Sequence, residues 1–261
     1  MLESITPLIL TYNESPNIER TLQKLQWARR IVVIDSFSTD ATLDILKRYS
    51  QVEVIQRKFD THAKQWNFGL EQIQSEWVLS LDADYVLTDA LINELKTLSP
   101  SPEIDGYFIP FKYCVFGKPL RGTILPPRQA LFRKARSHYI DDGHTQLLVV
   151  KGHSEFLSKP IDHDDRKSLS RWLWAQDRYM TLEVKKLQKT PLSKLSWGDK
   201  IRQQKILAPF IIFIYCLIIK GGILDGWRGW YYAFQRVFAE ILLSLRLMEA
   251  ELLETSGTNQ P

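Results

Sequence analysis

Clusters of polar and acidic residues follow three apolar runs in the first hundred residues. They occupy residues 11–14 (TYNE), 35–40 (DSFSTD) and 82–84 (DAD). Carboxylates gathered in one place repel each other, and they repel anions, unless a cation lies among them. Hard oxygen ligands suit Mg²⁺ or Mn²⁺, and such an ion also bridges substrate phosphates. The clusters therefore predict a divalent-metal site that holds a nucleotide diphosphate.

Simpler interpretations compete with this one. An isolated D-x-D sequence is a weak signal, and Asp35 before serine and threonine is also typical of a turn or a helix cap. No glycine-rich phosphate loop is present in the chain, neither a G-x-G-x-x-G nor a Walker sequence. Asp35 and the D-A-D sequence at 82–84 nevertheless both follow apolar runs in one α/β pattern, and that shared context favours the metal-assisted site.

Alternating strands and helices are expected to position these clusters. Apolar, β-branched runs predict strands at 5–11, 31–35, 52–56 and 77–81. Helical spacing predicts helices that open at Ser15-Pro16, at a Ser38 or Thr39 cap, and over 62–74. Pro7 lacks an amide proton and argues against a fully paired central position in the first strand. The alternation predicts a parallel, doubly wound sheet, which binds ligands outside the carboxyl ends of its strands.

The pattern changes after residue 100. Residues 106–116 and 129–134 predict strands that extend the sheet and build a pocket wall, and from Ser168 onward the spacing is helical. We therefore expect a catalytic domain over 1–165 and a helical region over 166–255. Within the latter, the apolar spacing of 227–252 predicts an amphipathic helix.

The helical region contains a basic stretch followed by an apolar one. Residues 185–205 carry seven lysines and arginines against one acid, Asp199, and residues 206–219 carry no charge. Fourteen residues are fewer than the roughly 20 that span a bilayer. The segment is therefore either a buried helix of a bundle or an element that rests on an anionic membrane surface. Without a nucleic-acid-binding module, nucleic-acid binding is disfavoured.

Composition excludes several classes of protein. The 261 residues are 44% hydrophobic, which excludes disordered, collagen-like and low-complexity chains. Cys114 and Cys216 lie far apart, which excludes a disulfide scaffold and a cysteine-based zinc finger. The first ten residues lack the pattern of a signal peptide, so we expect a cytoplasmic protein, peripheral or monotopic at the inner face of the plasma membrane.

Together these motifs resemble the family 2 glycosyltransferases, which have the GT-A fold. The matching pieces are T-Y-N-E (11–14), V-V-I-D-S-x-S-T-D-x-T (32–42) and L-D-A-D (81–84). A subgroup, the lipopolysaccharide-core β-glucosyltransferases, is similar over further stretches: R-x-F (57–59), W-N-F-G-L (66–70), H-D-D-R-K-S-L (163–169) and L-D-G-W-R-G (224–229). The resemblance covers nearly the whole chain and implies a doubly wound α/β GT-A sheet, the fold of nucleotide-diphospho-sugar transferases, with a C-terminal helical region.

The resemblance also implies an activity and its partners. The expected reaction is an inverting transfer of a sugar from a UDP- or GDP-linked donor to a glycan or lipid-linked acceptor, assisted by Mn²⁺ or Mg²⁺. An enzyme acting on polyprenyl phosphate shares these donor-site motifs, and an inactive nucleotide-binding membrane scaffold would share the fold.

Residue roles follow from the same resemblance. Asp35 would contact the base or ribose, and Arg178 would either neutralise the leaving diphosphate or form an ordinary ion pair on a helix surface. A lone Lys64 on a helix is equally typical of a solvated face. The metal ligands would be Asp84, Asp82 and His163. The donor-binding residues would be Thr11, Asn13, Glu14, Asp35, Ser36, Lys64, Asn67, Asp82 and Arg178.

A direct displacement also needs a base for the acceptor hydroxyl. The subgroup usually carries a His-Glu pair where this chain has His144-Thr145, and it commonly has an acid where this chain has Tyr85. Asp142 or Asp141 is therefore the expected base, although D-D-G is also an ordinary turn. His144 would alternatively act as base or orient the acceptor.

Overall fold

The computed structural model describes residues 1–142 and 145–257. The chain folds into two compact units. The first contains residues 1–119 and 125–167, and the second contains residues 120–124 and 168–257.

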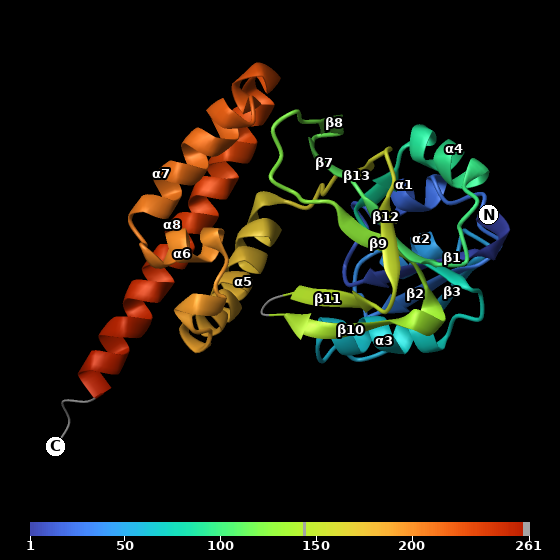
Figure 1. Ribbon diagram of the computed structural model, residues 1–261, viewed down its shortest axis with the longest axis horizontal. Helices are drawn as coiled ribbons and strands as arrows, with labels where there is room; N and C mark the ends of the chain where they lie inside the picture. Colours follow the sequence, from blue (N-terminus) through green and yellow to red (C-terminus); the bar gives the residue numbers. More distant parts are fainter. Residues whose placement is uncertain (143–144, 258–261) are drawn as a thin grey trace. The chain divides into compact units, whose positions relative to one another are not determined.

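The first unit is built on a seven-stranded sheet with the order β12-β6-β9-β4-β1-β2-β3 (Figure 1). Strands β3, β2, β1 and β4 are parallel, whereas β9 runs antiparallel to both β4 and β6. The strands are β1 (Ile5–Thr11), β2 (Ile31–Asp35), β3 (Val52–Gln56), β4 (Trp77–Asp82), β6 (Ile104–Ile109), β9 (Arg128–Arg133) and β12 (His153–Phe156).

The four strands predicted from the first hundred residues are confirmed, and so is the prediction that later strands extend this sheet. Strand β1 is central despite Pro7. Its pairing with β2 begins only at Leu8, so Pro7 faces a paired neighbour on the β4 side alone. A missing amide proton is tolerated there because one side of the strand is not yet paired.

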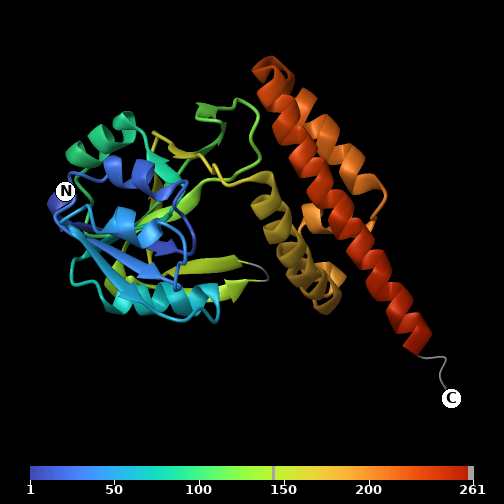
Figure 2. The same cartoon turned by 180° about the vertical axis from the view of Figure 1, so that it is seen from behind.

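Helices cover both faces of the sheet (Figure 2). Helices α1 (Ile18–Gln23), α2 (Thr42–Leu46) and α4 (Asp89–Thr97) pack on one face, and α3 (His62–Glu71) packs on the other beside the hairpin of β10 (Ser137–Asp142) and β11 (Thr145–Val150). Alternate strand residues serve the two cores: Ile9 belongs to the first cluster and Leu8 to the second. This burial on both faces explains the continuous apolar runs of the sequence.

Helix boundaries differ from the prediction. Helix α1 begins at Ile18 rather than at Ser15-Pro16, and α3 ends at Glu71 rather than at residue 74. Ser38 and Thr39 do not cap α2, which begins at Thr42 after a residue without a capping side chain. In the loop after β2, Ser38 instead donates its hydroxyl to Asp35, and Thr39 donates its N–H to Asn13.

A smaller four-stranded sheet has the order β5-β13-β7-β8. Its strands are β5 (Tyr85–Leu87), β7 (Phe111–Val115), β8 (Lys118–Pro119) and β13 (Ile161–His163). The single strand predicted over 106–116 is thus two strands that separate at Pro110 and join different sheets. Because His163 pairs with Tyr85, this sheet brings the 163–167 stretch to the end of β4.

The second unit is helical. It contains α5 (Leu169–Lys189), α6 (Trp197–Gln203), α7 (Leu207–Ile214), a π-helical turn (Tyr215–Ile219) and α8 (Trp227–Gly257), with short 3₁₀ segments at Leu192–Lys194 and Gly222–Asp225. The first unit has two further 3₁₀ segments, at Leu2–Ser4 and Lys134–Arg136. The predicted amphipathic helix is confirmed as α8, five residues longer than expected. Over the described residues, no helix combines the length and apolar character needed to cross a membrane.

Candidate active site

The carboxyl ends of β1, β2 and β4 meet at one edge of the sheet. Strand register places Thr11 beside Asp35 and Leu10 beside Asp82. The polar clusters that follow these strands are therefore neighbours, as the sequence predicted. Parallel pairing produces this arrangement, because it aligns strand ends that are distant in the chain.

Asp35 is fully buried, with 0% of its surface exposed. Its carboxylate accepts hydrogen bonds from the Thr11 hydroxyl (2.9 Å), from the backbone N–H (2.9 Å) and hydroxyl (2.5 Å) of Ser38, and from Gln56 Nε2 (3.3 Å). Every one of these partners belongs to the protein. In this structure Asp35 and Thr11 order the loop after β2, and their predicted contacts with a donor remain predictions.

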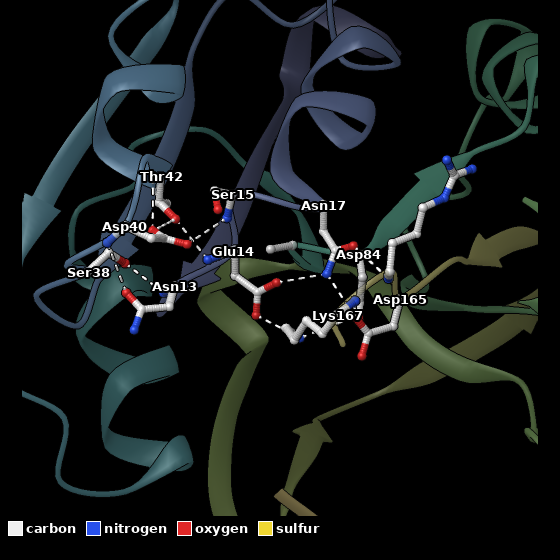
Figure 3. A network of polar contacts seen from close by, with 12 residues as sticks. Asn13, Glu14, Ser15, Asn17, Ser38, Asp40, Thr42, Asp84, Asp165 and Lys167 are labelled. Carbon is white, nitrogen blue, oxygen red and sulfur yellow. Dashed lines mark hydrogen bonds and ion pairs between the residues drawn. The ribbon is translucent and has the colours of Figure 1, made fainter. Parts of the chain in front are cut away.

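Asn13 ties the end of β1 to the same loop (Figure 3). Its amide oxygen accepts from the Thr39 N–H (2.8 Å), and its own N–H donates to the Ser38 hydroxyl (2.9 Å). Asn13 has φ 55°, a left-handed conformation that asparagine tolerates better than most residues. Ser36 donates its N–H to the Thr11 carbonyl (2.9 Å), and its hydroxyl accepts from Gln65 (3.1 Å).

Asp84 is buried and pairs with the half-buried His163. The Oδ2 atom of Asp84 lies 3.2 Å from Nε2 of His163. Burial alone would lower the pKa of His163, but the Asp84 carboxylate outweighs burial and raises it. Burial likewise would raise the pKa of Asp84, and the imidazolium charge instead holds it well below its usual range. Asp84 Oδ1 and His163 Nδ1 are buried without a hydrogen-bond partner in the structure.

The unpartnered atoms bear on the predicted metal. Asp84 Oδ2 and His163 Nε2 lie 3.2 Å apart, a separation that suits two ligands of one divalent ion. Asp84 Oδ1 is unpartnered and offers that ion a second oxygen. Within residues 1–142 and 145–257, no group of three or more histidine, cysteine, aspartate or glutamate residues has the spacing of a metal site. The role of Asp82 as a third ligand stays a prediction.

Tyr85 takes the position where the related subgroup has an acid, and it contacts Asp82. Its hydroxyl accepts a hydrogen bond from Arg128 (2.7 Å) and bonds the Asp82 carboxylate. Burial and the nearby Asp82 charge raise the pKa of Tyr85, so its hydroxyl stays protonated. The tyrosine thus connects Arg128 to Asp82, and sequence reasoning did not foresee this arginine.

Lys167 is a half-buried cation beside the Asp84–His163 pair, with 18% of its side chain exposed. Its Nζ lies 3.0 Å from Glu14 Oε1 and 3.5 Å from Asp165 Oδ1. Asn17 Nδ2 donates to the other oxygen of Glu14 (3.0 Å) and to Asp165 (2.9 Å), which closes the network (Figure 3). Burial would lower the pKa of Lys167, but the charges of Asp84 and Glu14 raise it, so the ammonium is permanently charged.

Sequence reasoning named Glu14 but missed Lys167, Asn17 and Asp165. Lys167 belongs to the H-D-D-R-K-S-L stretch that carried the family resemblance. A lysine in a charged loop is ordinarily exposed, and only the fold shows that this one is half-buried among acids. The one available signal was its position within that motif.

Other predicted residues have partners within the fold. Lys64 forms an exposed ion pair with Asp60 (3.4 Å), which matches the solvated-face interpretation. Asn67 donates to the carbonyl of Tyr139 (2.9 Å) and accepts from its N–H (2.8 Å), so it fastens α3 to β10. In the second unit, the Arg178 guanidinium lies 4.8 Å from the Trp174 ring centroid on α5. Donor contacts by these three residues stay predictions.

The candidate bases lie at the end of the β10–β11 hairpin. Asp141 accepts a hydrogen bond from the Ala63 N–H (3.2 Å), so it satisfies a donor in the first turn of α3. Asp142 is the last residue of β10 and is half-buried. His144 lies outside the described residues.

Burial raises the pKa of Glu14 to about 7, although the Lys167 charge opposes this shift. Between pH 4.5, the ordinary pKa of glutamate, and pH 7, Glu14 holds a proton in the folded protein that it has released in the unfolded chain. The free energy of unfolding should therefore fall as pH rises through this window, by about 3 kcal/mol from this group. We expect Glu14→Gln to flatten this decline, as measured by denaturant unfolding in chelator. An equally steep decline in the variant would contradict the assignment, and Glu19→Gln on the exposed surface serves as control.

Comparisons with known proteins identify the family of this chain. The family model described as "Glycosyl transferase family 2" matches residues 8–140, just over half of the chain. An uncharacterized glycosyltransferase of Rickettsia prowazekii is 30% identical over 107 residues, which are 41% of this chain and 36% of that protein. The lipopolysaccharide core biosynthesis glycosyltransferase LpsC of Rhizobium meliloti is 30% identical over 108 residues, 40% of each chain.

The chain thus matches about two-fifths of the length of these curated relatives. Among solved structures, S. aureus TarS 1-349 in complex with UDP-GlcNAc aligns with a TM-score of 0.50 at 14% identity. The alignment covers 94% of this chain and 92% of that one, and at such identity it shows a shared fold. The predicted GT-A α/β fold is therefore confirmed, and the chain belongs to glycosyl transferase family 2.

Proposed function

We propose that the protein transfers a sugar, with inversion at the anomeric carbon, from a nucleotide-diphosphate donor to a glycan or lipid-linked acceptor. The observation that carries this proposal is the Asp84–His163 pair with Lys167 beside it, at the carboxyl edge of a family 2 fold. An anionic donor needs positive charge at this edge, and Lys167 is a cation whose counter-ions hold it in place. The expected donor is UDP- or GDP-linked.

Asp84 and His163 would hold a divalent metal. The nitrogen ligand favours Mn²⁺ over Mg²⁺, because Mg²⁺ is bound almost entirely through oxygen. When bound, the ion would neutralise negative charge on the departing diphosphate. The imidazole must be neutral to bind a metal, so binding competes with the proton that Asp84 now stabilises on His163.

The protein's own groups would divide the remaining work. Lys167 supplies a fixed charge whose position Glu14, Asp165 and Asn17 determine. A charge held in this way needs little reorganisation when the diphosphate charge develops. Asp82, bonded by Tyr85, would lie nearest the ribose and diphosphate, as the resemblance implies.

The base prediction separates Asp142 from Asp141. We expect Asp142→Asn to lower kcat by about 10²-fold or more, with little change in the KM for the donor, because loss of a general base affects the chemical step. Asp141→Asn should change kcat and stability little, because the asparagine amide oxygen can still accept from the Ala63 N–H in the first turn of α3. Steady-state kinetics and thermal unfolding of both variants, with His144→Asn alongside, test this. A larger loss of kcat in Asp141→Asn or His144→Asn would move the base to that residue.

Transfer itself is tested with a panel of UDP- and GDP-sugars, with Mn²⁺, with Mg²⁺ and with chelator. We expect metal-dependent release of UDP or GDP from at least one donor, and faster release with a lipid-linked core oligosaccharide than without acceptor. The similarity to LpsC, a lipopolysaccharide core biosynthesis glycosyltransferase, supports this choice of acceptor. Release only with polyprenyl phosphate would favour the polyprenyl-phosphate enzyme, and no release from any donor would contradict the proposal.

A further inference from the structure

Helices α7 and α8 form a hairpin in the second unit, and its closed end exposes large apolar side chains. Cys216, Leu217 and Ala233 pack between the helices and are buried. Six large apolar residues around the turn between the helices are instead exposed to solvent. We call them the hairpin tip: Ile214, Ile218, Ile219, Ile223, Leu224 and Trp227. Leu224 is 68% exposed and Trp227 is 56% exposed. Large apolar side chains that are exposed together around one turn are typical of an interaction site.

The tip has a tightly packed backbone. A Cβ added to Gly229 would lie 1.8 Å from the carbonyl oxygen of Gly222, and one added to Gly222 would lie 2.6 Å from that of Cys216. Residues 120–124 pack here too, since a Cβ on Gly122 would lie 2.7 Å from the Lys220 carbonyl. Only glycine permits such close approach of backbone segments. The apolar side chains therefore project from a preformed turn.

Charge at the tip is positive. Residues 206–239 contain one acid, Asp225, and it accepts from the Arg121 N–H (2.9 Å). Lys220 lies over the Tyr215 ring (5.5 Å) and Arg228 over the Trp227 ring (4.5 Å). Apolar residues mixed with tryptophan, tyrosine and flanking cations are typical of elements that rest in the interface of an anionic bilayer.

Two of the seven cations of the basic stretch 185–205 pair with acids of α8. Arg202 pairs with Glu240 (3.1 Å) and Lys205 pairs with Glu251 (2.5 Å). These two cations fasten α6 and the segment before α7 to α8, so they contribute little attraction toward lipid. The hairpin tip supplies the apolar surface that the basic stretch lacks.

We propose that the hairpin tip inserts into the head-group region of an anionic lipid bilayer. A second copy of this chain fits less well. In a two-fold contact centred on the tip, Lys220 and Arg228 would meet the same cations of the other copy, and like charges at an interface are unfavourable. Against a lipid surface the same cations meet phosphate groups while the tip side chains leave water.

Vesicle flotation of the full chain tests this proposal. We expect the protein to float with phosphatidylcholine vesicles that contain phosphatidylglycerol, and more weakly with phosphatidylcholine alone. Leu224→Glu/Trp227→Glu should reduce partitioning by at least ~10-fold, because two large side chains can no longer be buried. The matched control is Phe156→Glu on β12, since Phe156 is also 68% exposed but belongs to the first unit.

Both side chains are exposed, so the tip variant should keep the circular dichroism spectrum and unfolding temperature of the wild type. Failure of the wild type to float, or equal flotation of the tip variant, would overturn the proposal. Dimerisation of the wild type in lipid-free buffer that is lost in the tip variant would also overturn it, in favour of contact between copies. Quenching of tryptophan fluorescence by brominated lipid should decrease in Trp227→Phe, and unchanged quenching would argue against insertion of this residue.

Discussion

Asp84→Asn should lower sugar transfer by at least about 10²-fold and remove most of its dependence on Mn²⁺. The asparagine keeps the size of the side chain but loses the charge that a divalent ion requires. It also removes the carboxylate that now lies 3.2 Å from His163 and raises the pKa of that histidine. The variant should therefore bind Mn²⁺ more weakly, as measured by electron paramagnetic resonance or calorimetry without donor.

Two controls separate this effect from general damage. Asp44→Asn changes an exposed acid on α2 and should leave both activity and Mn²⁺ binding unchanged. His163→Gln should weaken Mn²⁺ binding as well, because it removes the partner ligand. If Asp84→Asn kept full metal-dependent turnover, the assignment of the metal to this pair would be wrong. If it lost turnover but bound Mn²⁺ normally, Asp84 would act on the substrate directly.

The sequence was most informative where physical constraints are local and repeated. Strand β2 is a run of β-branched residues because both of its faces are buried, and a buried parallel strand leaves few other choices. The clusters at the strand ends then followed from topology alone, because parallel strands bring their carboxyl ends to one edge. This reasoning located Thr11, Asp35 and Asp82 at a common edge without any structure.

Long-range partners could not be foreseen. The sequence does not show that both ends of the Asn67 amide bond the backbone of Tyr139, 72 residues later. It also does not show that the Asp141 carboxylate accepts from the first turn of α3. The predicted start of α2 was wrong for the same reason. Ser38 has a side chain suited to capping, but its hydroxyl donates to Asp35 and accepts from the Asn13 N–H. Polar side chains satisfy whichever donor the fold brings near, and local patterns do not record that choice.

Lys167→Met should destabilise the first unit by about 2–3 kcal/mol near pH 8, because removal of the cation leaves half-buried carboxylates without compensation. Glu14, Asp165 and Asp84 all lie within the field of this ammonium. Methionine keeps a similar length and apolar stem, so the loss reports charge rather than packing. Activity should fall as well, since the proposed diphosphate contact is gone. Denaturant unfolding in chelator gives the free energy of unfolding.

The pH dependence distinguishes a charge effect from a packing defect. Glu14 protonates at about pH 7 in the wild type, and without Lys167 its pKa should rise further, since that cation opposes the effect of burial. A protonated Glu14 carries no charge, so the cost of Lys167→Met should shrink as pH falls toward 5. For the same reason, Lys167→Met/Glu14→Gln should recover part of the lost stability at pH 8 but not the lost transfer activity. A cost that stays constant across this range, with no recovery in the double variant, would mean that Lys167 contributes through its stem alone and would remove it from the donor site.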